Sequence, residues 1–399
     1  MARTKAQLAD NFRESDFLTL ASLLGVVSFD ALGNAMKKCG LATQRYRKLP
    51  LELMAYYVIC LSLYSSISLQ EVLRCILEGL DWLKLKMPCG EIKGRGGISR
   101  ARNRLGSKVM RVLFEDVCKP MAQPDTIGAF YRKWRLTAID GTTFDLPDEP
   151  SNGEFFGRPP CSRGKTAFPQ LRLTALIETG TRAIIGVAYG PYSEGENTQA
   201  KRLLPLLKED MLLLADRGFG CYPVFAESAK TGAALLFRIR GNMKFTREKV
   251  LADGSFLSTF YSGAEQRKKT NGIPIRVMEY TMKGTKEKYR LVTNVLNAEE
   301  APASELAALY HERWEIELAY DELKNHLKRP GATLRSKTPE LVIQELFGYL
   351  LAHYTIRSLM HRAARKDKID PDRLSFVNAV QILRRKITAA HFPPLPSGN

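Results

Sequence analysis

Four side chains able to handle phosphates or metal ions share one predicted helix in the last third of the chain. Within YHERWEIELAYDELKNHL they occupy offsets 0, 3, 7 and 14, as Tyr310, Arg313, Glu317 and Lys324. At about 100° per residue these offsets fall in a stripe about 60° wide. Apolar residues fill the neighbouring arc and would hold the helix to a core: Leu309, Ile316, Tyr320, Leu323 and Leu327. By periodicity alone, a solvated surface helix explains the four residues equally well.

Two aspartates lie where β-strands would carry them into a site. Asp140 falls inside a run of strand character, Leu136–Thr142, where a buried carboxylate needs a partner or a metal. Asp145 would face the other side of a regular strand, so it is a poor companion for Asp140. Asp216 closes the apolar run Leu212–Ala215, at the strand end where α/β sheets place ligand groups. The alternative for Asp216 is an acid that merely ends a strand.

Two strand aspartates and a helix glutamate make a set of hard oxygen ligands suited to Mg²⁺ or Mn²⁺. Two such ions would activate water or a 3′-hydroxyl and stabilise the departing oxygen in an in-line displacement at phosphorus. Arg313 would grip a phosphate as a bidentate fork and Lys324 as a point charge. Tyr310 would donate a hydrogen bond or stack. These residue types together predict phosphodiester chemistry.

The charge balance points to the same class of substrate. Lysine and arginine total 60 against 42 aspartates and glutamates, a net charge of +18. Residues 240–290 hold 12 basic and 5 acidic residues, and residues 322–399 hold 14 and 6, net +7 and +8. Both stretches flank the candidate site. Such an excess favours nucleic acid as the partner, with an ordinary basic soluble protein as the alternative.

Cysteines and apolar runs exclude other classes. The seven cysteines form no CxxC pair and have no histidine cluster beside them, so we expect reduced thiols rather than disulfides or a zinc site. The N-terminus has no apolar signal-peptide core, and the longest apolar-rich run, residues 54–64, is too short to span a bilayer. No membrane role is expected.

The elements that must position the site change along the chain. Helical periodicity covers residues 17–121, short β-rich runs follow, and two long helices are predicted over 304–328 and 339–363. This pattern predicts an α/β fold with a mixed sheet. We expect a separate helical N-terminal domain over 1–123, an α/β region over 124–240, a β-rich insertion over 241–300, a helical region over 301–365 and a C-terminal segment over 366–399.

The chain resembles the insertion-sequence-four transposases, bacterial DDE enzymes with a YREK signature. The resemblance rests on AIDGTTFDLPD around Asp140, on LLADRGF around Asp216, and on Tyr-x2-Arg-x3-Glu-x6-Lys from Tyr310 to Lys324. Further similar segments are KLPLELMAYYVICLSLY, ISRARNRLG, AFPQLRLTALIETG and LRSKTPELVIQELFGYLLAHY. Together they cover nearly the whole chain from about residue 29 to 362.

The resemblance implies a ribonuclease-H-like catalytic core whose two parts, over 124–240 and 301–365, are separated by the β-rich insertion. A helical DNA-binding domain over 1–123 would precede it. It implies a transposase that binds the terminal inverted repeats of its own element, cleaves the ends and joins them to target DNA by two-metal chemistry. Asp140, Asp216 and Glu317 would hold Mg²⁺ or Mn²⁺ and act as the catalytic triad. Tyr310, Arg313 and Lys324 would contact DNA phosphates. A homodimer in the synaptic complex and a cytoplasmic, nucleoid-associated location follow from the same resemblance.

Tryptophan and arginine usage leaves two points open. Relatives that form a DNA hairpin hold a flipped base with a tryptophan of the insertion, which this insertion lacks; Tyr261, Tyr280 or a phenylalanine would have to substitute. Trp314 would contact a displaced base or pack in the core. Three arginines on one predicted helix would read or hold DNA, or form a solvated basic face: Arg100, Arg102 and Arg104.

Two rival functions remain. A metal-dependent nuclease on the same fold would cut DNA without strand transfer. A decayed copy would bind its element as a repressor and cut nothing, although an intact triad with the YREK spacing argues against decay.

Overall fold

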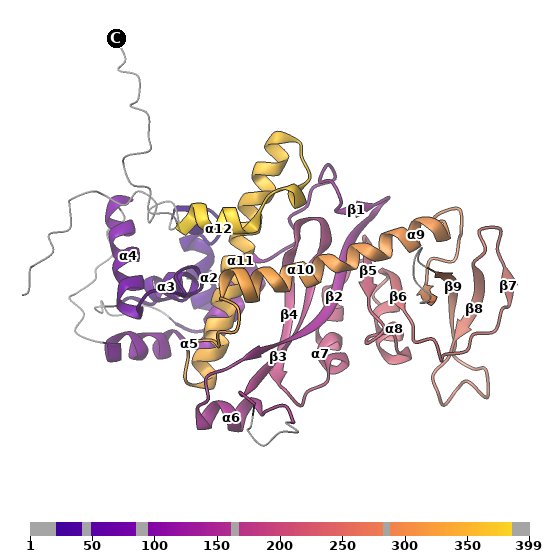
Figure 1. Cartoon of the computed structure of the whole chain (residues 1–399), viewed down its shortest axis with the longest axis horizontal. Helices are drawn as coiled ribbons and strands as arrows, with labels where there is room; N and C mark the ends of the chain where they lie inside the picture. The colour runs from indigo at the N-terminus through magenta and orange to yellow at the C-terminus, as the bar shows by residue number, and fades with distance from the viewer. Residues whose placement is uncertain (1–20, 42–48, 85–94, 161–166, 282–287, 385–399) are drawn as a thin grey trace, which may run out of the picture.

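The computed structural model describes residues 21–41, 49–84, 95–160, 167–281 and 288–384 (Figure 1). The first twenty residues, Cys89, Cys161 and the last fifteen residues of the predicted C-terminal segment lie outside these ranges. None of the helices within the ranges is long and apolar enough to cross a membrane.

A mixed sheet forms the centre of the protein. Its described strands run in the order β4-β3-β2-β5-β6-β10-β9-β8-β7, with β1 beside β2. The strands are β1 (Phe130–Tyr131), β2 (Trp134–Asp145), β3 (Gln170–Glu178), β4 (Ala183–Pro191), β5 (Met211–Ala215), β6 (Ala234–Arg238), β7 (Lys249–Val250), β8 (Phe256–Phe260), β9 (Ile273–Thr281) and β10 (Lys288–Thr293). Strands β4, β3 and β2 are antiparallel, whereas β2, β5 and β6 are parallel. This α/β arrangement confirms the predicted fold class.

Strand β5 shows why the parallel part lies at the centre. All five of its residues are buried, which fits the uninterrupted apolar run MLLLA. Helices cover parallel strands on both faces, so neither face keeps polar residues. The β-rich insertion is confirmed, and it extends this same sheet: β10 pairs antiparallel with β6, and β9, β8 and β7 follow outward.

Helices precede, cover and follow the sheet. They are α2 (Phe29–Lys38), α3 (Leu51–Leu63), α4 (Leu69–Trp82), α5 (Arg95–Val117), α6 (Pro150–Phe156), α7 (Glu196–Leu203), α8 (Tyr222–Ala229), α9 (Ala303–Leu309), α10 (Trp314–Asp321), α11 (Pro339–Asp367) and α12 (Phe376–Arg384). The predicted helix over 304–328 is confirmed in extent but is not uniform. A 3₁₀ turn, Tyr310–Arg313, precedes α10, and a π-helical turn, Glu322–Leu327, follows it.

The N-terminal helices lie against α11, which returns from the C-terminal end of the chain (Figure 1). Helix α3 is buried almost all round, from Leu53 to Leu63, because it lies between its neighbours and α11. A Cβ on Gly348 would stand 2.5 Å from the Val58 carbonyl oxygen, so a glycine lets the two backbones approach. The helical region therefore shares its core with α11, and a domain boundary near residue 123 stays a prediction.

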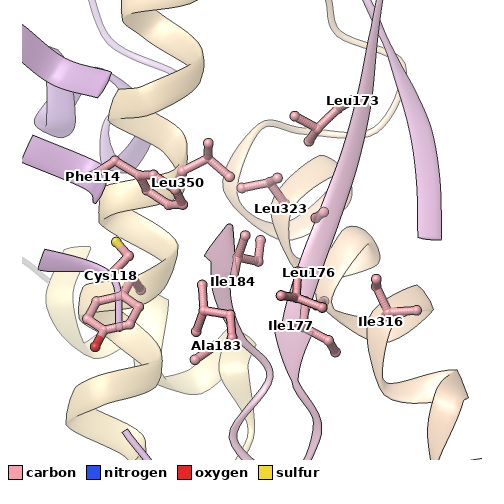
Figure 2. Packing of buried hydrophobic residues seen from close by; sticks show 14 of the residues in the cluster. Phe114, Cys118, Leu173, Leu176, Ile177, Ala183, Ile184, Ile316, Leu323 and Leu350 are labelled. Carbon is pink, nitrogen blue, oxygen red and sulfur yellow. The ribbon is translucent and has the colours of Figure 1, made fainter. Parts of the chain in front are cut away.

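One hydrophobic core joins the sheet to these helices. Figure 2 shows α11 beside β4 and the helix that carries the candidate site beside β3, and the π-helical turn that contains Leu323 also contacts α11. The labelled contributors are Phe114, Cys118, Leu173, Leu176, Ile177, Ala183, Ile184, Ile316, Leu323 and Leu350. Ile316 and Leu323 were predicted to pin the candidate helix, and both are fully buried. The apolar side of that helix thus fixes which side chains face β2.

Candidate active site

Asp140 lies on β2, and Asp216 directly follows the end of the neighbouring parallel strand β5. Ile139 of β2 is the register partner of Ala215, the last residue of β5, so an aspartate comes next in both segments. One carboxylate oxygen of Asp216 accepts the Gly218 N–H at 2.8 Å, which holds it in the turn after β5. The two aspartates are therefore positioned by the sheet backbone rather than by flexible loops.

Glu317 approaches the same place from α10, with an arginine between it and β2. The Arg313 guanidinium donates to Glu317 Oε1 at 2.8 Å and lies 3.7 Å from Asp140 Oδ2. Arg313 ends the 3₁₀ turn, and Glu317 follows one helical turn later. The arginine thus neutralises part of the negative charge that three carboxylates would bring together.

The carboxyl of Asp140 has a raised pKa. Burial raises the pKa of its carboxyl to about 7, although the Gly141 N–H, 2.8 Å from Oδ1, opposes the shift. The negative charges of Asp216 and Glu196 add to the increase, and Arg313 offsets them in part. Such a carboxyl has too little positive charge around it in this state, and a bound cation would lower its pKa.

The remaining residues of the predicted stripe also face the strands. Lys324 Nζ donates to Thr142 Oγ1 of β2 at 3.1 Å. Tyr310 is buried, which raises the pKa of its hydroxyl, and its surroundings include the charges of Arg313 and Asp216. The structure therefore brings together the four helix residues and both aspartates. Asp145 takes no part, because it accepts a hydrogen bond from Gln170 Nε2 at 2.7 Å.

Trp314 projects into solvent beside this site. Its side chain is 57% exposed, and the Arg313 guanidinium lies 5.6 Å from its ring centroid. The interpretation of Trp314 as a core residue is therefore wrong. An exposed indole next to a cluster of phosphate-binding residue types is suited to stacking on a nucleobase.

The carboxylates have the chemistry of a divalent metal site but are not gathered into one. In the part of the chain that the structure describes, no three or more His, Cys, Asp and Glu side chains are grouped closely enough to hold an ion. The hydrogen bond from Arg313 engages Glu317, so Glu317 must leave Arg313 to join the two aspartates. The neighbouring carboxyl groups of Asp140 and Asp216 nevertheless provide oxygen ligands that suit a hard cation, and the pKa of Asp140 is raised.

Family comparisons agree with this arrangement. Residues 132–355 match a family model described as Transposase DDE domain, and residues 18–115 match one described as Insertion element 4 transposase N-terminal. The chain belongs to the DDE transposases of the insertion-element-4 family. The first match contains both aspartates and the whole helix that carries Glu317.

This DDE transposase is similar to individual proteins that are named as transposases. It is 28% identical over 376 residues to the transposase InsG for insertion sequence element IS4 of Escherichia coli strain K12, covering 92% of this chain and 83% of the relative. It is 25% identical over 183 residues to the putative transposase InsZ of the same organism, covering 45% and 57%. Among solved structures, the piggyBac transposase synaptic complex with hairpin DNA is similar with a TM-score of 0.49, 10% identity, and coverage of 95% and 83%.

The predicted arginine face of the N-terminal region needs correction. Arg102 is only 5% exposed, and its guanidinium donates to Gln344 Oε1 at 2.8 Å and to Ser336 Oγ at 3.0 Å. It ties α5 to α11 and cannot reach DNA in this state. Arg104 donates to the Leu49 carbonyl at 2.9 Å and is half-buried. Arg100 is exposed, so of the three it is the one placed to meet a phosphate.

Two residues near the candidate site were missed or undervalued by sequence reasoning. A Cβ at position 141 would stand 2.5 Å from the Glu196 carboxylate carbon, so Glu196 lies directly against Gly141. Arg172 holds Glu196 at 2.9 Å. Tyr320 was assigned only to the core, yet its hydroxyl reaches the backbone of Asp140 at 2.6 Å. Neither contact is encoded in local periodicity, because each joins segments far apart in sequence.

The two tyrosines suggested as substitutes for an insertion tryptophan lie in different places. Tyr280 stacks on Tyr289, with ring centroids 5.3 Å apart, and its ring lies 6.5 Å from that of His311. His311 directly follows Tyr310, so Tyr280 is close to the site. Tyr261 instead lines a cavity of about 680 Å³ within the insertion, together with Phe245 and Phe260. That either tyrosine holds a flipped base stays a prediction.

Proposed function

We propose that this DDE transposase binds the terminal inverted repeats of its insertion sequence, cleaves both ends and joins the 3′ ends to target DNA. Asp140, Asp216 and Glu317 are the proposed ligands of two Mg²⁺ ions, for which Mn²⁺ can substitute. The main support is the placement of both aspartates next to each other on the sheet, with Glu317 on the facing helix and linked to Asp140 through Arg313. A duplex DNA partner also accounts for the net charge of +18.

The bound ions would activate the attacking oxygen and stabilise the departing one during in-line displacement. The carboxyl of Asp140 must be ionised to serve as a ligand, and a nearby cation favours that form. Arg313, whose present partners are Glu317 and Asp140, would grip a phosphate in bidentate fashion when these carboxylates serve as metal ligands. Lys324 and Tyr310 border the same strands and would hold further backbone oxygens.

We propose that Trp314 contacts a DNA base and that the N-terminal helices contribute to recognition of the element ends. The exposed Trp314 ring would stack on a base displaced near the cleaved end. Arg100 is proposed as a phosphate contact, whereas Arg102 and Arg104 support the helices that present it. Two element ends must be held together for joining, so we propose a homodimer in the synaptic complex.

The decisive experiment measures cleavage and strand transfer of DNA that carries the element's own ends, in Mg²⁺ or Mn²⁺. Parent protein is compared with Glu317→Ala and with Asp321→Ala, a control on the same helix whose acid instead meets His326 at 3.0 Å. We expect both activities in the parent and in the control, and a loss of at least about a thousandfold in Glu317→Ala, since a metal ligand supplies several kcal/mol.

Other outcomes separate the rivals. Cleavage without strand transfer in the parent would make the protein a nuclease. Binding of the ends with no cleavage under any condition would make it a DNA-binding copy with repressor-like action. Equal activity of Glu317→Ala and the parent would remove Glu317 from the triad.

A further inference from the structure

Tyr320 fastens the helix that carries Glu317 to the backbone of Asp140. It lies in α10 almost one turn after Glu317 and is only 6% exposed. Its hydroxyl donates to the Asp140 carbonyl at 2.6 Å and accepts from the Ala175 N–H at 3.1 Å. Asp140 and Ala175 are register partners on β2 and β3. The hydroxyl therefore bridges the backbones of β2 and β3 at the position of Asp140, a proposed metal ligand.

Helical hydrogen bonds alone fix the position of Glu317 poorly. Helix α10 has eight residues, preceded by the 3₁₀ turn Tyr310–Arg313 and followed by the π-helical turn Glu322–Leu327. Such turns change the number of residues per turn, so rotation and rise along the helix depend on tertiary contacts. Three polar contacts dock this stretch on β2: Arg313 to Asp140, Tyr320 to Asp140 and Lys324 to Thr142.

These contacts differ in what happens when substrate binds. Arg313 and Lys324 use charged groups that, under the proposed function, must turn to DNA phosphates. Tyr320 instead contacts main-chain groups, which neither metal nor DNA needs. Its hydrogen bonds can persist through the reaction, whereas the other two polar contacts cannot. The hydroxyl is thus the polar contact that holds Glu317 at Asp140 after the charged contacts have been released.

We propose that Tyr320 is a positioning residue whose hydroxyl fixes the separation of Asp140 and Glu317 while Arg313 and Lys324 exchange partners. This inference rests on the proposed function, because it takes both carboxylates as metal ligands. The competing interpretation is a buried tyrosine whose hydroxyl merely satisfies nearby backbone groups, as buried tyrosines usually do. The two interpretations differ in what the loss of one oxygen atom does to metal binding.

Tyr320→Phe removes that oxygen with little change in packing, and the chain provides a matched control. Tyr354 on α11 is also buried, donates to the Lys119 carbonyl at 2.8 Å and accepts the Lys119 N–H at 3.3 Å. Tyr354→Phe therefore deletes the same pair of backbone hydrogen bonds at a place that belongs to the N-terminal packing. Three quantities are measured: single-turnover cleavage of element ends, affinity for the ends without metal, and Mn²⁺ affinity of DNA-free protein by electron paramagnetic resonance.

We expect Tyr320→Phe to slow cleavage by about 10–100-fold, because small misplacements of reacting groups cost that much. Mn²⁺ affinity should fall by about tenfold, as for loss of a group that orients a metal ligand. Affinity for the DNA ends should stay at the parent's value. Tyr354→Phe should keep the parent's cleavage rate and Mn²⁺ affinity, even if its melting temperature falls as much.

A parent-like cleavage rate and Mn²⁺ affinity in Tyr320→Phe would overturn the inference, as would equal losses in the two variants. Should Tyr320→Phe fail to fold, para-aminophenylalanine at position 320 restores the donor to Asp140 and should bind Mn²⁺ with the parent's affinity; weaker Mn²⁺ binding by the folded variant counts against the idea. If Glu317→Ala cleaves like the parent, the proposed triad fails, and that result is separate from any effect at Tyr320.

Discussion

Two glutamates five residues apart on one helical stretch have opposite surroundings. Glu317 is 39% exposed in its side chain and, among the residues described, pairs with a single cation, Arg313. Glu322 is 5% exposed and accepts hydrogen bonds from His353 at 3.0 Å, from Arg357 at 2.8 Å and from Arg182 at 3.1 Å. One carboxylate is left accessible, and the other is enclosed by partners.

This difference separates a ligand from an anchor. Glu322 joins the β3–β4 hairpin, through Arg182, to α11, through His353 and Arg357. A carboxylate with all its acceptors used inside the protein has no capacity for a metal, whereas Glu317 can exchange Arg313 for one. The same residue type on neighbouring turns therefore serves stability in one case and chemistry in the other.

The largest expected effect is on stability at Glu322. Glu322→Gln removes the negative charge that pairs with the buried Arg357, whereas Arg182 keeps Glu315 and Asp372 as partners. The free energy of unfolding should therefore fall by about 3–5 kcal/mol, mainly through Arg357. Glu317→Gln, on an accessible side chain, should change it by no more than about 0.5 kcal/mol. Urea denaturation of both variants measures this contrast, and similar losses in the two would break it.

A change of pH should alter the stability contributions of Glu322 and Asp140 in opposite directions. Burial alone would raise the pKa of Glu322, but the hydrogen bond from His353 and the charge of Arg357 hold it at about 2. Its stabilising contribution is complete above its ordinary value of 4.5 and is lost as pH falls towards 2. Asp140 keeps its proton up to about pH 7, although the unfolded chain loses it near 3.8, so its contribution declines as pH rises between these values.

Unfolding free energies of metal-free protein between pH 3 and 8 test this second prediction. Asp372 also has a pKa raised to about 7, so the parent must be compared with Asp140→Asn, in which Asp372 is unchanged. The parent should lose stability relative to Asp140→Asn as pH rises from about 4 to 7. Parallel curves over that range would show that the Asp140 carboxyl is not perturbed.

A smaller effect is expected on DNA binding at Trp314, the exposed neighbour of the accessible carboxylate. Trp314→Ala should weaken binding of element ends by about 1–3 kcal/mol, the usual value of a stacked base. Its free energy of unfolding should stay within about 0.5 kcal/mol of the parent's, because a side chain 57% exposed adds little to the core. Titration with fluorescent end DNA and thermal melting measure the two quantities. A loss of stability without a loss of binding would return Trp314 to a packing role.

The smallest effect is expected at Arg100. Arg100 is accessible and Arg102 is buried, so the two arginines show the same contrast as Glu317 and Glu322. Arg100→Ala should reduce the slope of the logarithm of affinity against the logarithm of salt by about one, with the fold intact. Arg102→Met should instead lower stability, because it removes the donors to Gln344 and Ser336. Binding isotherms at several salt concentrations decide the matter. An unchanged slope for Arg100→Ala would take the arginine out of DNA recognition.

Much of the fold and part of the site are predictable from sequence because they depend on short-range patterns. The run around Asp140, the apolar stretch before Asp216 and the helix that contains Glu317 each have a local period that gives element and face. The insertion is predictable from turn residues that separate runs of alternating apolar and polar residues. Its place at the edge of the same sheet is not predictable in this way, because β6 and β10 pair across more than fifty residues.

By itself, the sequence determined the order of elements, the carrier of each carboxylate and the residue types of a phosphodiester site. Only the tertiary structure decided which of the charged residues stay accessible. Helical periodicity says which side chains share a face, but not what lies opposite that face. Arg102 and Glu322 are enclosed because α11 packs over them, and Arg100 and Glu317 are left accessible. The physical reason is that desolvation and ion pairing depend on neighbours brought from distant parts of the chain.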